Sequence, residues 1–448
     1  MSPLEKRTVS TLALIYALRM FGLFMVLPVL AIYGKDYQGA TATLVGIAIG
    51  AYGLTQALLQ LPFGVWSDRI GRKPVILVGL ILFTLGSALA AVADDIWLLI
   101  LGRALQGAGA VASTLMALMT DLTREENRTK AMASIGASIG LSFTLAMVAG
   151  PILASWLGLS GLFYLTAVLS VGAMVLLYTL VPTPTQQVRS RDARAFAHQL
   201  KDVVMDKQIL RLSFGIFALH AVLVGTFVAV PVALLEAGML QSDHWQVYLP
   251  VMFIAFVCMV PFIIVAEKRK KMKEVLLLAV GLLTLGTASM ALSVNSLQGL
   301  IGSLWLFFLA FNILEASLPS LISKFAPAGY KGSAMGLYST SQFMGAFVGG
   351  VLGGYLSEHV SLAGVFWGLL PLLLVWFALV ASMQRPKHLT SYMVNLHEQN
   401  LETCIDLEDR LLALPGVDEV VIMLKEQAAY LKVDNKTFDP TKLKQLNI

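Results

Sequence analysis

Four ionisable side chains lie deep inside long apolar stretches of this sequence, and they are its first candidates for chemistry. They are Arg19, Arg103, His220 and Glu315. A charge at the centre of a bilayer costs about 2.5–3.5 kcal/mol on insertion scales, so such residues are rare unless they pair or take part in function. Glu315 is the one carboxylate among them, which makes it the first candidate for a group that binds and releases a proton. Structural pairing of Glu315 with a basic group is the competing explanation.

The three basic candidates also have structural explanations. Arg103 could anchor helix packing by donating hydrogen bonds to backbone carbonyls. A histidine such as His220 is more often a packed interior residue than a proton relay. Arg19 could bind an anion in a cavity or pair with a distant carboxylate, and the sequence leaves both open. Polar side chains in the same stretches that could contact a substrate are Tyr16, Gln106, Asn312 and Gln342.

The elements that must position these residues are membrane-spanning helices. The chain is 57% hydrophobic and only 13% charged, with a mean hydropathy of +0.77, whereas soluble domains carry about 25% charged residues. Apolar runs of about 20 residues are long enough to cross a bilayer, and their continuous character favours helices over the alternating strands of a barrel. The expected spans are residues 8–33, 41–66, 74–93, 96–120, 130–156, 161–181, 209–236, 245–266, 274–294, 298–323, 332–357 and 361–383.

Lys and Arg residues gather in the loops on one side of these spans. The opposite loops contain Lys35 alone. The positive-inside rule therefore places the basic loops and both termini in the cytoplasm. This distribution also explains the net charge of +5, so nucleic acid is not an expected partner. A long basic loop at 182–208 divides the helices into two halves of six spans, 1–181 and 209–383, and is expected to be a cytoplasmic linker.

The loop after the second span carries a dense group of charges in the sequence GVWSDRIGRK, residues 64–73. Asp68 lies where the second span ends, on the side where the eleventh span begins near Gly332. Because a helix N-terminus carries partial positive charge, Asp68 could hold the two halves together on that side. Arg72 could pair with Asp121 at the end of the fourth span.

Other residues of the same loop have simpler expected roles. Gly64 could allow close helix approach, and Gly71 could allow a tight turn. We call the expected contact between Asp68 and the start of the eleventh span the latch. Arg69 and Lys73 could contribute to the latch or could only set the topology of the loop.

The two halves echo one another, because residues 262–273 repeat the pattern of an apolar run, one carboxylate and a basic cluster. Residues 64–73 resemble motif A of the major facilitator superfamily, G-x-x-x-D-R-x-G-R-[KR], at every fixed position. Residues 101–109 resemble its motif B. Residues 140–151 resemble the antiporter motif C, although Ala154 and Ser155 replace the glycines that usually follow. The resemblance covers residues 1–383.

This resemblance implies a fold and several residue roles. The fold would be two six-helix halves around a central cavity, an all-α polytopic membrane protein. The first, fourth, seventh and tenth spans would line the cavity, and these four spans carry the four interior ionisable residues. Motif A would stabilise the outward-facing state. Arg103 would occupy the motif B position that the family associates with proton transfer.

Residues 388–448 have the composition of a soluble domain. Their pattern predicts a βαββα order typical of a ferredoxin-like fold, with strands near 392–396, 419–424 and 429–433. The segment resembles heavy-metal-associated domains, but Asn400 and Thr403 occupy the positions of the two metal-binding cysteines. No bound metal is therefore expected. Regulation, ligand sensing or self-association is the expected role of this small α+β domain, and a passive appendage is an alternative.

Together these features predict a proton-coupled secondary transporter that exports small drug-like or amphipathic compounds. We expect it in a bacterial inner membrane, with a small-molecule substrate, protons and the lipid bilayer as its partners, and with no cofactor. A transporter of one specific metabolite on the same fold is an alternative. A membrane sensor or scaffold that presents residues 388–448 is a second alternative. The sequence shows no Walker loop, metal-ligand cluster or nucleophilic triad, so an enzyme is not expected.

Overall fold

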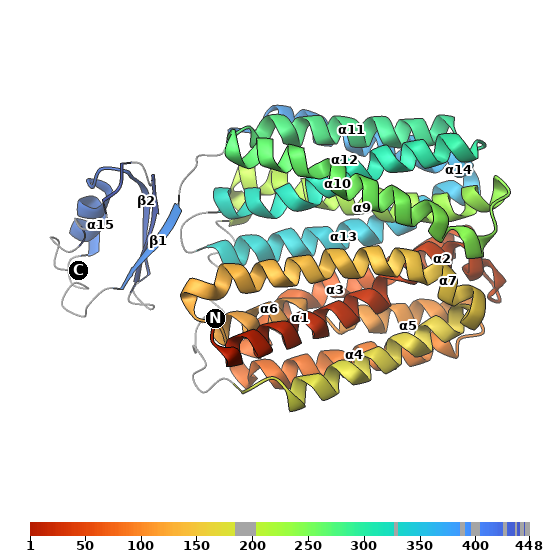
Figure 1. Ribbon diagram of the computed structural model, residues 1–448, viewed down its shortest axis with the longest axis horizontal. Coiled ribbons are helices and arrows are strands. Elements are labelled where there is room, and N and C mark those ends of the chain that lie inside the picture. Colours follow the sequence, from red (N-terminus) through yellow and green to blue (C-terminus); the bar gives the residue numbers. More distant parts are fainter. Residues whose placement is uncertain are drawn as a thin grey trace.

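The structure is a helical bundle with a small α/β domain beside one end (Figure 1). It is a computed structural model. The residues that it describes are 1–183, 203–326, 330–385, 390–395, 404–423, 428–434, 437–439 and 443. The described part of the linker expected at 182–208 is therefore confined to its two ends.

The first half contains residues up to 181. Its elements are α1 (Pro3–Phe24), α2 (Leu27–Tyr33), the short 3-10 helix η1 (Gly34–Asp36), α3 (Ala42–Ile70), α4 (Arg72–Ala91), α5 (Ile96–Ala108), α6 (Ala112–Asp121) and α7 (Glu125–Thr179). Local capping explains several helix starts. Ser2 and Glu5 form a reciprocal capping box at the start of α1, and the Asp95 carboxylate accepts hydrogen bonds from the first amides of α5.

The second half repeats this organisation. Its elements are α9 (Lys207–Glu236), the 3-10 helix η2 (Gln241–Asp243), α10 (Trp245–Lys268), α11 (Met272–Leu292), α12 (Leu297–Phe325), α13 (Lys331–His359) and α14 (Leu362–Ala381). Figure 1 shows the two sets of helices as neighbouring groups, with α13 next to the first half. The predicted major facilitator architecture of two helical halves is confirmed.

The expected spans correspond to these helices, and two of the spans are interrupted. Among the described residues, ten segments are long and apolar enough to cross a membrane. One of them, Lys130–Thr179, turns back at Gly158, where φ is 67°, and so supplies the fifth and sixth spans (Figure 1). The helix α13 corresponds to the eleventh expected span, 332–357. The first span is broken between α1 and α2, and the fourth is broken at residues 109–111, where the sequence had predicted one uninterrupted helix.

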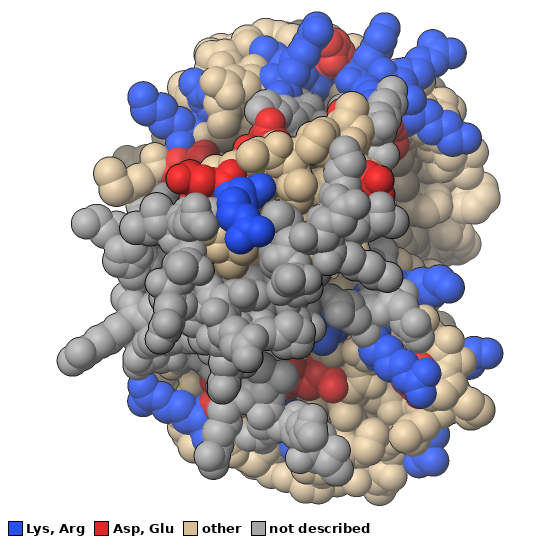
Figure 2. Space-filling model, turned by 90° about the vertical axis from the view of Figure 1, so that its left-hand side faces the viewer, with Lys and Arg blue, Asp and Glu red and all other residues tan. Residues whose placement is uncertain are grey.

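Charged residues distinguish the two ends of the bundle. We call the end that carries residues 68–73 the basic side, and the end that carries η1 and η2 the opposite side. Figure 2 looks onto the basic side and shows Lys and Arg around its rim. The exposed run 268–271 belongs to this rim. The N-terminus and the C-terminal domain lie at this same end (Figure 1).

The two halves meet closely near the opposite side, through α3 and α13. A Cβ atom at Gly46 would lie 2.2 Å from the Gly350 carbonyl oxygen, so the two backbones touch there. Small residues permit such close helix approach in membranes. The backbone amide of Thr43 donates to the Glu358 carboxylate at 2.7 Å, and Gln241 donates to the Tyr33 hydroxyl at 2.6 Å. The structure is therefore a state that is closed on the opposite side.

The C-terminal domain contains β1 (Thr390–Asn395), α15 (Cys404–Leu412), β2 (Val417–Met423) and β3 (Ala428–Val433). The sheet order is β1-β3-β2, with both pairs antiparallel. This is the strand order of a ferredoxin-like sheet, as the sequence predicted. Of the helix expected to end the βαββα order, only Leu443 lies within the described residues, and the positions 400 and 403 compared with metal ligands lie outside them.

Candidate functional site

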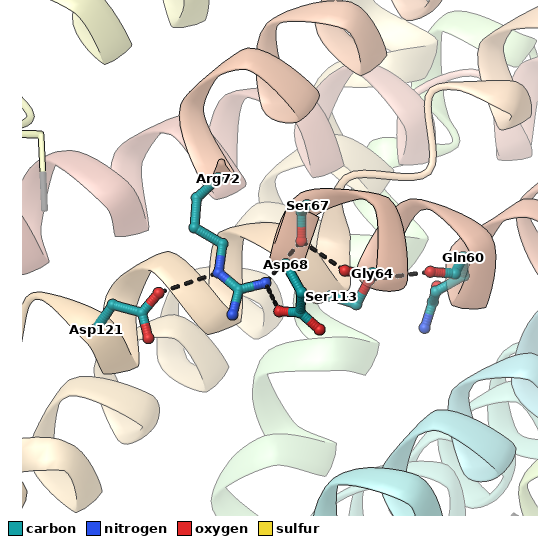
Figure 3. Close-up of polar contacts among 7 residues, drawn as sticks. All are labelled: Gln60, Gly64, Ser67, Asp68, Arg72, Ser113 and Asp121. Atoms are coloured by element: carbon teal, nitrogen blue, oxygen red, sulfur yellow. Dashed lines mark hydrogen bonds and ion pairs between the residues drawn. The ribbon is translucent and has the colours of Figure 1, made fainter. Parts of the chain in front are cut away.

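The charges of the 64–73 loop form a compact cluster on the basic side, centred on Arg72 (Figure 3). Arg72 begins α4 and reaches across the ends of two other helices. Its Nε donates to the Asp121 carboxylate of α6 at 3.0 Å, which is the pairing expected from the sequence. Its Nη1 donates to the Ser67 hydroxyl at 2.7 Å and forms an ion pair with Asp68. One guanidinium therefore joins the ends of α3, α4 and α6.

The remaining residues of the loop support this arrangement in different ways. Gly71 has φ 105°, which a side chain would strain, so the turn between α3 and α4 requires glycine here. A Cβ atom at Gly64 would make only an ordinary contact, 3.7 Å from Ser113, so the close approach expected there is not seen. The ammonium of Lys73 donates to the Val181 carbonyl. Arg69 is exposed.

The structure places Asp68 within the first half. Its ion pair with Arg72 is the one recorded for it among the described residues, whereas the sequence had predicted a contact with the start of α13. The closed opposite side gives the physical reason: a latch on the basic side belongs to the state in which that side is closed. The contact between Asp68 and α13 therefore stays a prediction for that other state.

In the interior of the first half, Arg103 is fully engaged with its surroundings. Its Nη1 donates to the Gln106 side-chain oxygen at 2.6 Å, and Gln106 in turn donates to Ser87 at 2.8 Å. The Nε and Nη2 of Arg103 reach carbonyl oxygens of residues 48 and 49 on α3. The ring of Tyr52 lies 4.8 Å from its guanidinium carbon. This geometry fits an anchor between α5 and α3.

Arg19 lies on α1 in the same interior and is less completely engaged. Its Nη2 donates to the Gln56 side-chain oxygen at 2.9 Å and to the Gly109 carbonyl at 3.1 Å. The Nε and Nη1 of Arg19 have no hydrogen-bond partner in the described part of the chain. Tyr16, one turn earlier on α1, is buried and lies within electrostatic range of Arg19.

In the second half, the structure brings His220 of α9 and Gln342 of α13 together. The His220 Nε2 and the Gln342 amide nitrogen are 2.8 Å apart, and His220 Nδ1 lies 3.3 Å from the Ile216 carbonyl oxygen. A neutral ring that carries its proton on Nδ1 satisfies both contacts. The ring of Phe311 is 6.2 Å away.

Glu315 lies one turn beyond Phe311 on α12 and is half-buried. Its Oε2 is buried without a hydrogen-bond partner among the described residues. The Tyr338 hydroxyl of α13 is also buried without a partner there, and it lies within electrostatic range of Glu315. Asn312, three residues before Glu315, is half-buried as well. The four ionisable candidates thus lie in three separate groups, and no described hydrogen bond or ion pair links Glu315 to either arginine.

Sequence reasoning missed an aromatic cluster that connects the halves. Phe143 of α7 stacks on Phe311 of α12, with ring centroids 6.1 Å apart, and meets Phe24 of α1 edge-on at 4.9 Å. Aromatic surfaces of this kind bind apolar and cationic ligands. The three residues come from three helices, so no local spacing in the sequence could have identified them.

The surroundings of Glu315 and His220 combine titratable, polar and aromatic side chains. Glu315 and His220 are titratable, Gln342 and Asn312 offer amide groups, and the ring of Phe311 lies 6.2 Å from that of His220. Within the described ranges, no group of three His, Cys, Asp or Glu residues could hold a metal ion.

Comparison with known proteins identifies the family of the chain. Residues 12–350 match the Major Facilitator Superfamily, and residues 400–446 match the YajR YAM domain. The chain is 46% identical over 445 residues to Inner membrane transport protein YajR of Escherichia coli strain K12, covering 99% of this chain and 98% of that protein. It is 29% identical over 366 residues to Multidrug resistance protein MdtH of Aeromonas hydrophila subsp. hydrophila, covering 80% and 89% of the two chains.

A solved structure shows the same fold. A bacterial homologue of the human lysosomal transporter Spinster, in an inward-facing and occupied conformation, matches with a TM-score of 0.69 at 15% identity, covering 85% of this chain and 97% of that one. The family resemblance inferred from the residues of motif A is confirmed, and the relative from Escherichia coli is named as a transport protein. The chain is a transporter that belongs to the major facilitator superfamily.

Proposed function

We propose that this transporter is proton-coupled and exports small, drug-like or amphipathic compounds by alternating access. The proposal rests on the burial of Glu315, a carboxylate inside the helical bundle. Its Oε2 is buried without a hydrogen-bond partner among the described residues. Protonation would remove the cost of holding that charge in the interior. The relative named as a multidrug resistance protein supports the substrate class.

The proposed membrane and orientation follow from charge and from the relative. Lys and Arg surround the basic side (Figure 2), and the positive-inside rule places that side in the cytoplasm. Both termini would then be cytoplasmic. A bacterial inner membrane is the proposed location, because the relative from Escherichia coli is named as an inner membrane protein.

The two sides of the bundle supply the elements of alternating access. On the opposite side, the backbone contact of Gly46 with Gly350 and the hydrogen bond from Thr43 to Glu358 join the two halves. On the basic side, Arg72 forms an ion pair with Asp68, which lies near the end of α3. We propose that Asp68 and the rest of the 64–73 loop close the basic side when the opposite side opens, with Arg72 and Asp121 fixing the shape of the loop.

Proton movement in proteoliposomes tests the proton-coupling proposal. Purified protein is reconstituted with a pH-sensitive dye inside, and a panel of neutral and charged amphipathic compounds is added. We expect some compounds to trigger proton flux in the wild type and Glu315→Gln to remove that flux. Glu274→Gln is the matched control, because it makes the same change at a carboxylate that forms an ion pair with Arg385 at the surface. A Glu315→Gln variant that still couples would contradict the proposal.

The C-terminal domain is proposed to regulate the second half. The Lys432 ammonium of β3 donates to the Lys324 carbonyl at the end of α12, at 3.3 Å, and pairs with Glu419 at 3.2 Å. Lys324 itself pairs with Glu267, the carboxylate at the end of α10 that corresponds to Asp68. The domain thus contacts the same helix that carries Glu315, which favours regulation over a passive appendage.

A further inference from the structure

The interior of the first half has an excess of positive charge. Its six expected spans contain no Asp or Glu in their sequences, whereas Arg19 and Arg103 lie deep within them. Both arginine residues are 2% exposed. A buried charge is costly unless it is paired with an opposite charge, and neither guanidinium has a carboxylate beside it among the described residues.

The two arginine residues satisfy their hydrogen bonds very differently. Each of the three nitrogen atoms of Arg103 has an acceptor. In Arg19, only Nη2 has acceptors, while Nε and Nη1 are buried without one in the described part of the chain. The amide nitrogen of Gln56, whose oxygen accepts from Arg19, is also buried and unpartnered there. The unpaired atoms of this pair are therefore all donors, which is the pattern of a site that lacks its acceptor.

A helix start lies at the same place. Arg19 donates to the Gly109 carbonyl, and Gly109 begins the break between α5 and α6. The first hydrogen bond that closes α6 runs from the Leu115 amide to the Val111 carbonyl, so the earlier amides of α6 have no acceptor inside the helix and point back toward the break. Such interrupted helices form substrate and ion sites in transporters, with their N-termini directed at anionic groups.

From these observations we infer that Arg19, Gln56 and the start of α6 form an anion subsite inside the first half. Its ligand is a carboxylate or an inorganic anion of similar size, held by the free guanidinium N–H groups, the Gln56 amide and the helix terminus. Anions at helix N-termini are stabilised by the aligned peptide dipoles. The inference deepens the proposed transport function, because a carboxylate carried on the exported compound would be the natural occupant.

Thermal unfolding of the full-length protein in detergent tests this inference without any transport assay. Sodium benzoate, sodium chloride or sodium phosphate is added to a salt-free zwitterionic buffer, and benzamide is the neutral match for benzoate. We expect benzoate to raise the Tm by about 2 °C or more at saturating concentration, and benzamide to leave it unchanged. An effect of benzoate at far lower concentration than chloride or phosphate assigns the site to the carboxylate of an organic cargo. Equal effects of all three assign it to a free inorganic anion.

Two variants separate anion binding from a structural role. Arg19→Gln removes an unpaired buried charge, so it should raise the Tm in salt-free buffer while abolishing the shift with benzoate. Arg103→Gln breaks a satisfied network, so it should lower the Tm and retain the shift. An anion-dependent shift that persists in Arg19→Gln, an equal shift with benzamide, or no shift with any anion would overturn the inference. Because proton flux through Glu315 is measured separately, such a result would leave the proposed transport function standing.

Discussion

The close contact of α3 and α13 predicts that one added methyl group will change the balance between the two states of the transporter. A Cβ atom at Gly350 would lie 2.5 Å from the Gly46 carbonyl oxygen, which belongs to the other half. The clash is with backbone, so it is relieved only when the halves separate. Overpacking of this kind costs about 1–3 kcal/mol. Since about 1.4 kcal/mol is a tenfold change in an equilibrium constant, Gly350→Ala should shift the population toward opening of the opposite side by about 5- to 150-fold.

The shift can be measured as a distance distribution between spin labels on the two halves. Lys35→Cys and Ser361→Cys place exposed labels on the opposite side, one in each half, after both native cysteines are replaced. Gly350→Ala should increase the population with the longer label distance. Gly302→Ala is the matched control, because a Cβ atom there meets nothing within 4 Å and the gain in helix propensity is the same. Indistinguishable distributions in the two variants would refute the argument that this contact closes the opposite side.

Four further predictions follow from individual contacts. Glu358→Gln should weaken closure of the opposite side in the same label experiment, because the charged acceptor of the Thr43 amide is lost; an unchanged distribution would contradict this. Asp121→Asn should lower the free energy of unfolding by about 1.5–3 kcal/mol, since its carboxylate accepts from Arg72; equilibrium denaturation measures this, and no change would show that the pair is dispensable. Asp68→Asn should leave the protein folded and inserted while abolishing transport, and full activity would exclude the latch. Lys432→Ala should increase hydrogen exchange in residues 320–326 by removing the contact with the Lys324 carbonyl; equal exchange rates would argue against docking of the domain.

The sequence predicted the spans well because their signal is local. A run of apolar residues long enough to cross a bilayer is recognised without information about its neighbours. The Arg72–Asp121 pair was accessible because Arg72 precedes the third span and Asp121 follows the fourth, on the same side. The breaks in the helices were not predictable in this way. Residues 25–26 and 109–111 lie within continuously apolar sequence, so hydropathy carries no trace of the change in backbone direction there, whereas the turn at Gly158 lies between the expected spans 130–156 and 161–181.

Contacts between the halves were also beyond the sequence. Thr43 and Glu358 are 315 residues apart in the chain, and nothing in the periodicity of either segment indicates that they meet. The same holds for Phe143 and Phe311, which supply the aromatic surface from two different halves. For Arg19, the sequence left two roles open: binding an anion in a cavity, or pairing with a distant carboxylate side chain of the protein. The choice became possible only with the distribution of its hydrogen bonds, all of which use one nitrogen.

The contact at Glu358 suggests how the two sides of the transporter are made mutually exclusive. The helices α3 and α13 run in opposite directions, and each carries a carboxylate near its end, Asp68 on α3 and Glu358 on α13. In this structure Glu358 lies at the N-terminus of α3, where it accepts from the Thr43 amide. The symmetric arrangement would place Asp68 at the N-terminus of α13, which is the contact that the sequence predicts for the basic side.

Among the described residues, the structure shows the Glu358 contact and not the Asp68 contact. Asp68 instead forms an ion pair with Arg72 in its own half. Its charge is therefore paired while it makes no contact with α13. Rocking of the halves would exchange one carboxylate–helix contact for the other, and the dipole interaction lost on one side would be regained on the other. A small energy difference between the two states is what a transporter needs, because the binding of a substrate can then decide which side is open.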